Sequence, residues 1–218
     1  GPPTFTGVDE AGTFAGETGM TRAQAAAVLC RLADLVPVQS PGEDPAVQAG
    51  KVSDQALISQ ANGAILEQYQ FLYGLRLGAV FQQNWNSPVN LPGADGHSRP
   101  WFRVEDPRVS VLADIQTVWE TYFARSYPIP QAYLTQYQDI DGHLYTGNQG
   151  IGDDMTLDSI RMDRVLNRSG TKAVLRGVEY RVDPGSGAKS SRELRYTMVW
   201  EDGQWKCGGI TWADGTQY

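Results

Sequence analysis

Carboxylates are concentrated in one stretch of this sequence, and their spacing offers the clearest chemistry in the chain. From Asp139 to Asp158 there are five aspartates and no lysine or arginine. Such a run presents negative charge to a basic partner or to a cation. Asp153 and Asp154 are neighbours, and they directly follow a segment rich in glycine.

The same stretch contains fragments of two ligand-binding patterns, and both are incomplete. Asp139-Ile140-Asp141-Gly142-His143 resembles part of a calcium loop, but it lacks a third oxygen ligand before the glycine and a closing glutamate. Glycines can cradle a phosphate, yet two aspartates follow these glycines at once, and a strand-like sequence comes next. We therefore expect no metal and no cofactor. The glycines are Gly147, Gly150 and Gly152.

Catalytic patterns are also missing. His97 and His143 lie in polar turns without a partner at metal-ligand spacing, and no Gly-x-Ser-x-Gly or serine-lysine motif occurs. Asp153 and Asp154 could act as acid and base, but adjacent positions do not show that two carboxylates face each other across a cleft. We expect a binding protein rather than an enzyme.

Net charge and the lengths of the apolar runs exclude further classes of partner. The 218 residues carry a formal charge of −7, which disfavours nucleic acid and anionic membrane surfaces. No apolar run approaches the roughly 20 residues that span a bilayer, so no membrane insertion is expected. Cys30 and Cys207 could form one bridge, although two isolated apolar-like cysteines are the favoured alternative.

The elements that would position these residues suggest an α+β fold, with helices packed on one face of a curved antiparallel sheet. Thr21 and Gln24 form a capping box for a first helix. Residues 37–52, with prolines, glycines and acids, are expected to be a linker. The main domain is then expected over 53–218, starting with a helix capped by Ser53.

Within this main domain, helical and strand-like patterns follow one another. An apolar stripe predicts a buried helix from Ser110 to Tyr122, and alternation predicts strands from Ile160 onward. Glu201 to Gln204 is expected to be a hairpin turn. The other expected segments are an exposed loop over Trp85–Arg99, a short strand over Trp101–Val104, a short helix near Tyr133, a strand over Ile140–Tyr145, a loop over Gly147–Met155, and one strand face with Val174, Val178, Tyr180 and Val182.

The N-terminal stretch "GTFAGETGMTRAQAAAVLCRLADLV" resembles the second half of an S-layer homology module. The shared features are a Gly-x-Phe loop and a Thr-Arg-Ala-Gln helix, so residues 1–36 would be a partial module. Such modules hold exported bacterial proteins to wall polysaccharide. The resemblance implies that Thr21 and Arg22 face that polymer.

The main domain resembles the bacterial D,L-endopeptidase inhibitor (IseA-like) family. The segments "WFRVEDPRVSVLADIQTVWETYFARSY", "YQDIDGHLYTGNQGIGDD" and "YTMVWEDGQWKCGGITW" carry the resemblance. It implies a nuclear-transport-factor-like or cystatin-like cone and inhibition of peptidoglycan cysteine peptidases by an acidic loop against a basic catalytic domain. The matching candidates are Asp139, Asp141, Gly147, Gly150, Gly152, Asp153 and Asp154.

The resulting expectation is an extracellular, cell-wall-associated protein that inhibits a cell-wall hydrolase. One alternative is a non-catalytic module that binds peptidoglycan or another glycan through Trp85, Trp101 and Tyr145. Another is isomerase or hydratase chemistry in a cone-shaped pocket, which would need a buried carboxylate with a raised pKa.

Overall fold

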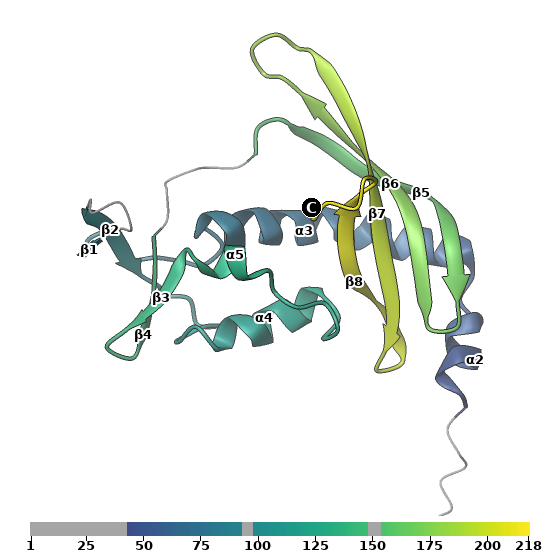
Figure 1. Ribbon diagram of the computed structural model, residues 1–218, viewed down its shortest axis with the longest axis horizontal. Coiled ribbons are helices and arrows are strands. Elements are labelled where there is room, and N and C mark those ends of the chain that lie inside the picture. The colour runs from purple at the N-terminus through teal and green to yellow at the C-terminus, as the bar shows by residue number, and fades with distance from the viewer. Residues whose placement is uncertain (1–42, 93–97, 148–153) are drawn as a thin grey trace, which may run out of the picture. The chain divides into compact units, whose positions relative to one another are not determined.

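The computed structural model describes residues 43–92, 98–147 and 154–218 (Figure 1). The chain divides into two units, residues 1–43 and 44–218, and every described helix and strand belongs to the second. The expected half-module, with Thr21, Arg22 and Cys30, lies outside the described residues. The elements in chain order are α2 (Pro45–Gly50), α3 (Asp54–Leu77), β1 (Val89–Pro92), β2 (Ser98–Arg103), α4 (Asp114–Tyr122), α5 (Gln131–Leu134), β3 (Tyr137–Ile140), β4 (His143–Thr146), β5 (Leu157–Ser169), β6 (Lys172–Val182), β7 (Lys189–Glu201) and β8 (Gln204–Trp212).

Two antiparallel sheets organise this unit. The larger has the order β5-β6-β7-β8 and is curled, and the smaller has the order β1-β2-β4-β3 (Figure 1). The expected α+β class with a curled antiparallel sheet is thus present, and the turn between β7 and β8 falls at Asp202 and Gly203, as predicted. Part of the loop expected over 85–99 is strand instead, since β1 covers 89–92 and β2 begins at Ser98, and Val89 pairs with Trp101 in spite of the prolines nearby.

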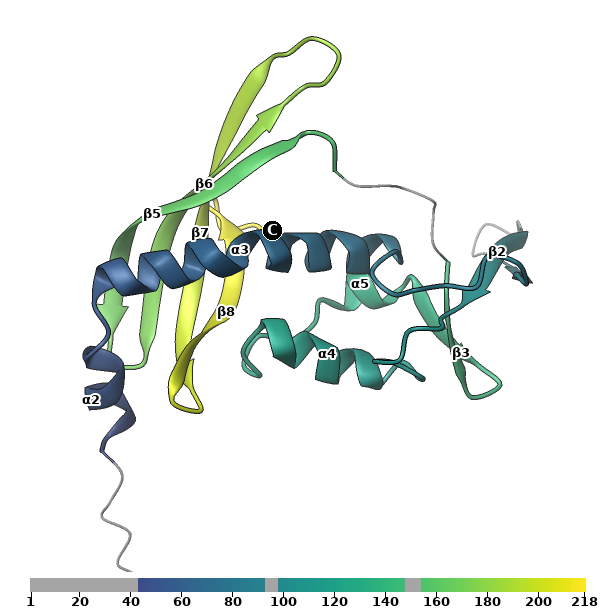
Figure 2. The same ribbon diagram turned by 180° about the vertical axis from the view of Figure 1, so that it is seen from behind.

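Helix α3 lies against the larger sheet over one half of its length and beside α4 and α5 over the other half (Figure 2). Ser53 caps its start by accepting from the Ala56 N–H at 3.2 Å, and left-handed Gly78 ends it, so this helix prediction is confirmed. Polar side chains fix it to the sheet. The Asn62 amide accepts from the Met162 N–H at 2.7 Å and donates to the Met162 carbonyl at 3.0 Å.

The predicted apolar stripe of the 110–122 region is part of the core. Trp119 and Phe123 are fully buried, with ring centroids 4.3 Å apart, and Phe71 of α3 packs against both. The helix itself begins at Asp114 rather than Ser110, because the Asp114 carboxylate accepts from the Ser110 N–H at 2.7 Å. That bond holds the preceding turn outside the helix.

The boundary of the main unit lies at Asp44, before the expected start at Ser53. Within the expected linker 37–52, Asp44 caps α2 and Pro45 occupies the first helical turn. Ala49 is fully buried, and its carbonyl accepts from Arg168 of β5 at 2.5 Å. The proline that suggested a linker is therefore a helix start, and α2 belongs to the folded unit.

The β6 residues predicted to share one face, Val174, Val178, Tyr180 and Val182, do share it, and the opposite face of the strand packs on the core. The buried positions are Ala173, Leu175, Gly177 and Glu179, whereas Val178 and Tyr180 lie on the opposite face and Tyr180 is exposed. Gly177 allows close packing here, since a Cβ on it would come within 2.6 Å of Met162 Sδ. The buried face thus ends in a glutamate, which leads to the site described next.

Candidate functional site

The predicted acidic residues lie in two separate places. Asp141 and Gly142 form the tight turn between β3 and β4, with φ values of 50° and 76°. Asp139, on β3, is exposed, and its carboxylate accepts from the Leu112 N–H at 2.8 Å. These two aspartates therefore lie near the turn of the β3–β4 hairpin, whereas Gly147 follows the opposite end of β4.

Gly147 is held in place where the chain leaves the smaller sheet. Its N–H donates to the Gln136 carbonyl at 2.9 Å. A Cβ on Gly147 would lie 3.4 Å from the indole of Trp101, so the glycine lets the backbone pass close to that ring. The start of the glycine-rich segment is thereby fixed to β2 and to the residues before β3.

Asp154 is held where the chain enters the larger sheet. Its side chain is only 12% exposed, and Arg181 of β6 donates to it at 2.7 Å. The Thr156 hydroxyl donates to it at 2.6 Å, and the Tyr69 hydroxyl of α3 donates to the same carboxylate. Three parts of the fold therefore converge on this one carboxylate.

These contacts set the protonation state of Asp154. Burial by itself would raise the pKa of this carboxyl, but hydrogen bonds from Thr156, Tyr69 and Arg181 outweigh it and hold the pKa well below its usual range. Burial and the bond to Asp154 raise the pKa of the Tyr69 hydroxyl. Asp154 is thus an ionised structural acceptor, and it does not have the raised pKa expected of a general base.

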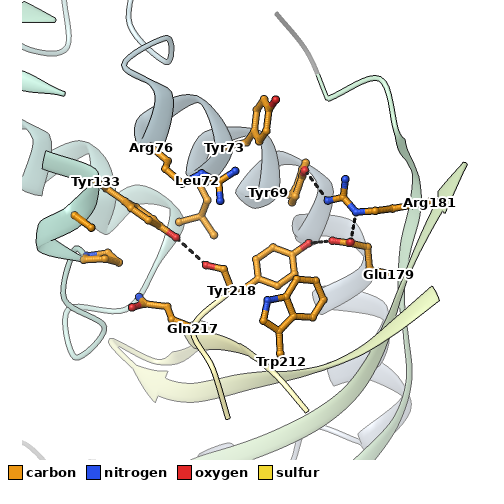
Figure 3. A pocket seen from close by; sticks show the side chains of 12 residues that line it. Tyr69, Leu72, Tyr73, Arg76, Tyr133, Glu179, Arg181, Trp212, Gln217 and Tyr218 are labelled. Carbon is orange, nitrogen blue, oxygen red and sulfur yellow. Dashed lines mark hydrogen bonds and ion pairs between the residues drawn. The ribbon is translucent and has the colours of Figure 1, made fainter. Parts of the chain in front are cut away.

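A second carboxylate, Glu179, was not predicted from the sequence. It is 2% exposed, accepts from the Arg181 guanidinium, and accepts from the Tyr218 hydroxyl (Figure 3). A single glutamate in an alternating strand is usually interpreted as solvent-facing, which is why it was missed. One signal could have indicated its burial. Glu179 is four residues after Leu175, so the two side chains lie on the same face of the strand.

These groups form part of the wall of a cavity of about 290 Å³ between α3, α5, the larger sheet and the residues after β8 (Figure 3). The wall is rich in aromatic rings. The Trp212 and Tyr218 rings lie 4.6 Å apart, and the Tyr133 hydroxyl donates to the Tyr218 carbonyl at 2.7 Å. The lining side chains labelled in Figure 3 are Tyr69, Leu72, Tyr73, Arg76, Tyr133, Glu179, Arg181, Trp212, Gln217 and Tyr218.

Of the predicted partner-binding residues, Asp139 and Asp141 are brought together at one turn, and Gly147 and Asp154 bound the acidic segment at its two ends. Gly150, Gly152 and Asp153 lie outside the described residues. Within the described ranges there is no cluster of three or more metal-binding side chains, and no helix is long and apolar enough to span a bilayer. Cys207 is buried as a free thiol, and burial raises its pKa to about 12.

A comparison with models of known protein families gives no match, and a search among curated proteins gives none either.

Proposed function

We propose that this is an extracellular, cell-wall-associated protein that inhibits peptidoglycan cysteine D,L-endopeptidases through the acidic, glycine-rich segment 147–154. The target would be a hydrolase with a basic catalytic domain. The partial S-layer homology module would add attachment to wall polysaccharide through Thr21 and Arg22. In this proposal the curled sheet with α3 corresponds to a nuclear-transport-factor-like or cystatin-like cone.

The observation that carries the proposal is the attachment of both ends of this segment. Gly147 is bonded to Gln136 and packed on Trp101, whereas Asp154 is bonded to Arg181 and Tyr69. Fixing the ends of a binding segment lowers the entropy that is lost on complex formation. Firm attachment of the two end residues, Gly147 and Asp154, is therefore consistent with a segment that binds another protein.

Charge supports the same partner. The net charge of −7 favours encounter with a basic surface, and complementary potentials accelerate association. The two neighbouring aspartates are expected to contribute differently. Asp154 is committed to Arg181, so its role is to position the segment, and Asp153 is the better candidate for direct contact with the hydrolase.

A second candidate function is glycan binding on the smaller sheet. Trp85 is 53% exposed, and its ring packs on Phe102 with centroids 4.6 Å apart. An exposed indole on a firm base can stack on a sugar ring. Binding of peptidoglycan fragments without any effect on hydrolases would favour this function.

The test is digestion of peptidoglycan by a panel of cysteine D,L-endopeptidases, with and without the full chain. We expect slower release of peptides with at least one member of the panel. Asp153→Asn should weaken the inhibition, and so should high salt, because the Debye length falls from about 10 Å at 0.1 M to about 3 Å at 1 M. Unchanged digestion across the panel would reject the inhibitor function.

A further inference from the structure

The cavity beside Arg181 has chemistry that the inhibitor proposal does not use. Two charged groups that line it, Arg181 and Glu179, are already paired, because Arg181 bonds to both Asp154 and Glu179, and Glu179 also accepts from Tyr218. A ligand gains little from groups that are already paired. The groups available to a ligand therefore lie elsewhere on the wall.

Arg76 is the available charge. It projects from the last turn of α3 and lines the cavity, with its guanidinium carbon 5.7 Å from the centre of the Tyr73 ring (Figure 3). Within residues 43–92, 98–147 and 154–218, no carboxylate forms an ion pair with Arg76. An exposed guanidinium at the wall of an aromatic cavity is a ready partner for an anion.

The aromatic walls define the rest of the ligand. Tyr73, Tyr133 and Trp212 surround the same space from α3, α5 and β8, and Leu72 adds an apolar contact. Flat rings pack well against such side chains. A volume of about 290 Å³ lies just below the roughly 300–1,000 Å³ typical of ligand sites, so the ligand is a small molecule.

We propose that this cavity binds a small aromatic carboxylate, with the carboxylate on Arg76 and the ring among the lining side chains of Leu72, Tyr73 and Tyr133. A cationic ligand fits poorly, because Arg76 lines the cavity without an ion pair among the described residues and would repel it. A doubly charged phosphate also fits poorly, since Arg76 would offset only one of its charges and Glu179 on the same wall would repel the second. A singly charged anion matches the wall.

Indole-3-acetate and its neutral analogue indole-3-acetamide are suitable probes, since they differ in charge and hardly in shape. Binding to the full chain can be measured by ligand-observed NMR and by calorimetry. We expect indole-3-acetate to bind at least tenfold more tightly than the amide. Arg76→Gln should remove that difference, and Arg76→Lys should retain part of it, because lysine keeps the charge but loses the planar fork.

Arg164→Gln is the matched control, since Arg164 is an exposed arginine on β5 that does not line the cavity. It should bind indole-3-acetate as the wild type does. No binding of indole-3-acetate to the wild type, equal affinity for acid and amide, or equal loss in the Arg164 and Arg76 variants would each overturn the proposal. None of these outcomes bears on hydrolase inhibition, so the two proposals can fail separately.

Discussion

The guanidinium of Arg181 lies 2.7 Å from the carboxylate of Asp154, and it bonds at the same time to buried Glu179. This arrangement joins the last residue of the acidic segment to the inner face of the larger sheet. Tyr69 adds α3 to the same cluster. The end of the segment is therefore coupled to the folding of the main unit.

Replacing Arg181 by glutamine should destabilise the protein by about 2–4 kcal/mol, because it leaves Glu179 buried without a cation. Urea unfolding at neutral pH measures this free energy. The double variant Arg181→Gln, Glu179→Gln should recover part of the loss, since the buried charge is then gone. A loss below about 0.5 kcal/mol, the size of an ordinary surface change, would contradict this account.

Asp106 should make stability depend on acid pH. Hydrogen bonds from Arg108, at 2.8 and 2.9 Å, lower the pKa of Asp106 to about 2. The folded-state pKa lies below the unfolded value of about 3.9, so the stabilisation is complete above about pH 4 and is lost as the pH falls toward 2.

The Asp106→Asn variant isolates this contribution. It should be less stable than the wild type by about 1 kcal/mol near neutral pH, a figure reduced because Arg108 is 45% exposed to solvent. The difference should vanish near pH 2 in urea unfolding series. A constant difference across that range would show that the effect of the substitution is not electrostatic.

Replacing Gly177 or Gly63 by alanine should change the stability of the protein in opposite directions. At Gly177 a Cβ would meet Met162 and Leu194 side-chain atoms at 2.6 and 2.7 Å, so Gly177→Ala should cost about 1–2 kcal/mol, limited by the flexibility of Met162. At Gly63, in α3, nothing lies within 4 Å, and alanine should stabilise the helix by about 0.5–1 kcal/mol. Thermal unfolding of both variants tests the core packing, and stabilisation by Gly177→Ala would contradict it.

Local signals in the sequence predicted much of this fold. Ser53 marked the start of α3, and Glu201 to Gln204 marked the last hairpin, because caps and tight turns depend on neighbouring residues alone. The core face of β6 was harder to predict. It carries Gly177 and Glu179, which look like solvent-facing residues until Met162, Leu194 and Arg181 are placed around them.

The candidate site was predictable only in part. The sequence identified Asp154 as a charged residue, but its partners Tyr69 and Arg181 are 85 and 27 residues away along the chain. No local pattern reports such distant contacts. The cavity next to them, with Arg76 and Trp212, could not be anticipated for the same reason.

Tyr69→Phe should distinguish the effect of how the acidic segment is positioned from the effect of its charge. It removes one hydrogen bond to Asp154 and leaves the net charge unchanged. We expect inhibition of the hydrolase to weaken several-fold with an unchanged salt dependence, whereas Asp153→Asn should weaken inhibition and reduce the salt dependence as well. Tyr145→Phe, at a tyrosine on β4 of the smaller sheet, serves as the control.

Hydrolase inhibition can be measured as the initial rate of peptidoglycan cleavage by a cysteine D,L-endopeptidase, titrated with the full chain at low and high salt. We expect the rate to fall to a low plateau as the chain is added, and more chain to be needed at high salt. A rate that stays constant up to a large excess of chain, for every enzyme of the panel, would contradict the proposed inhibition.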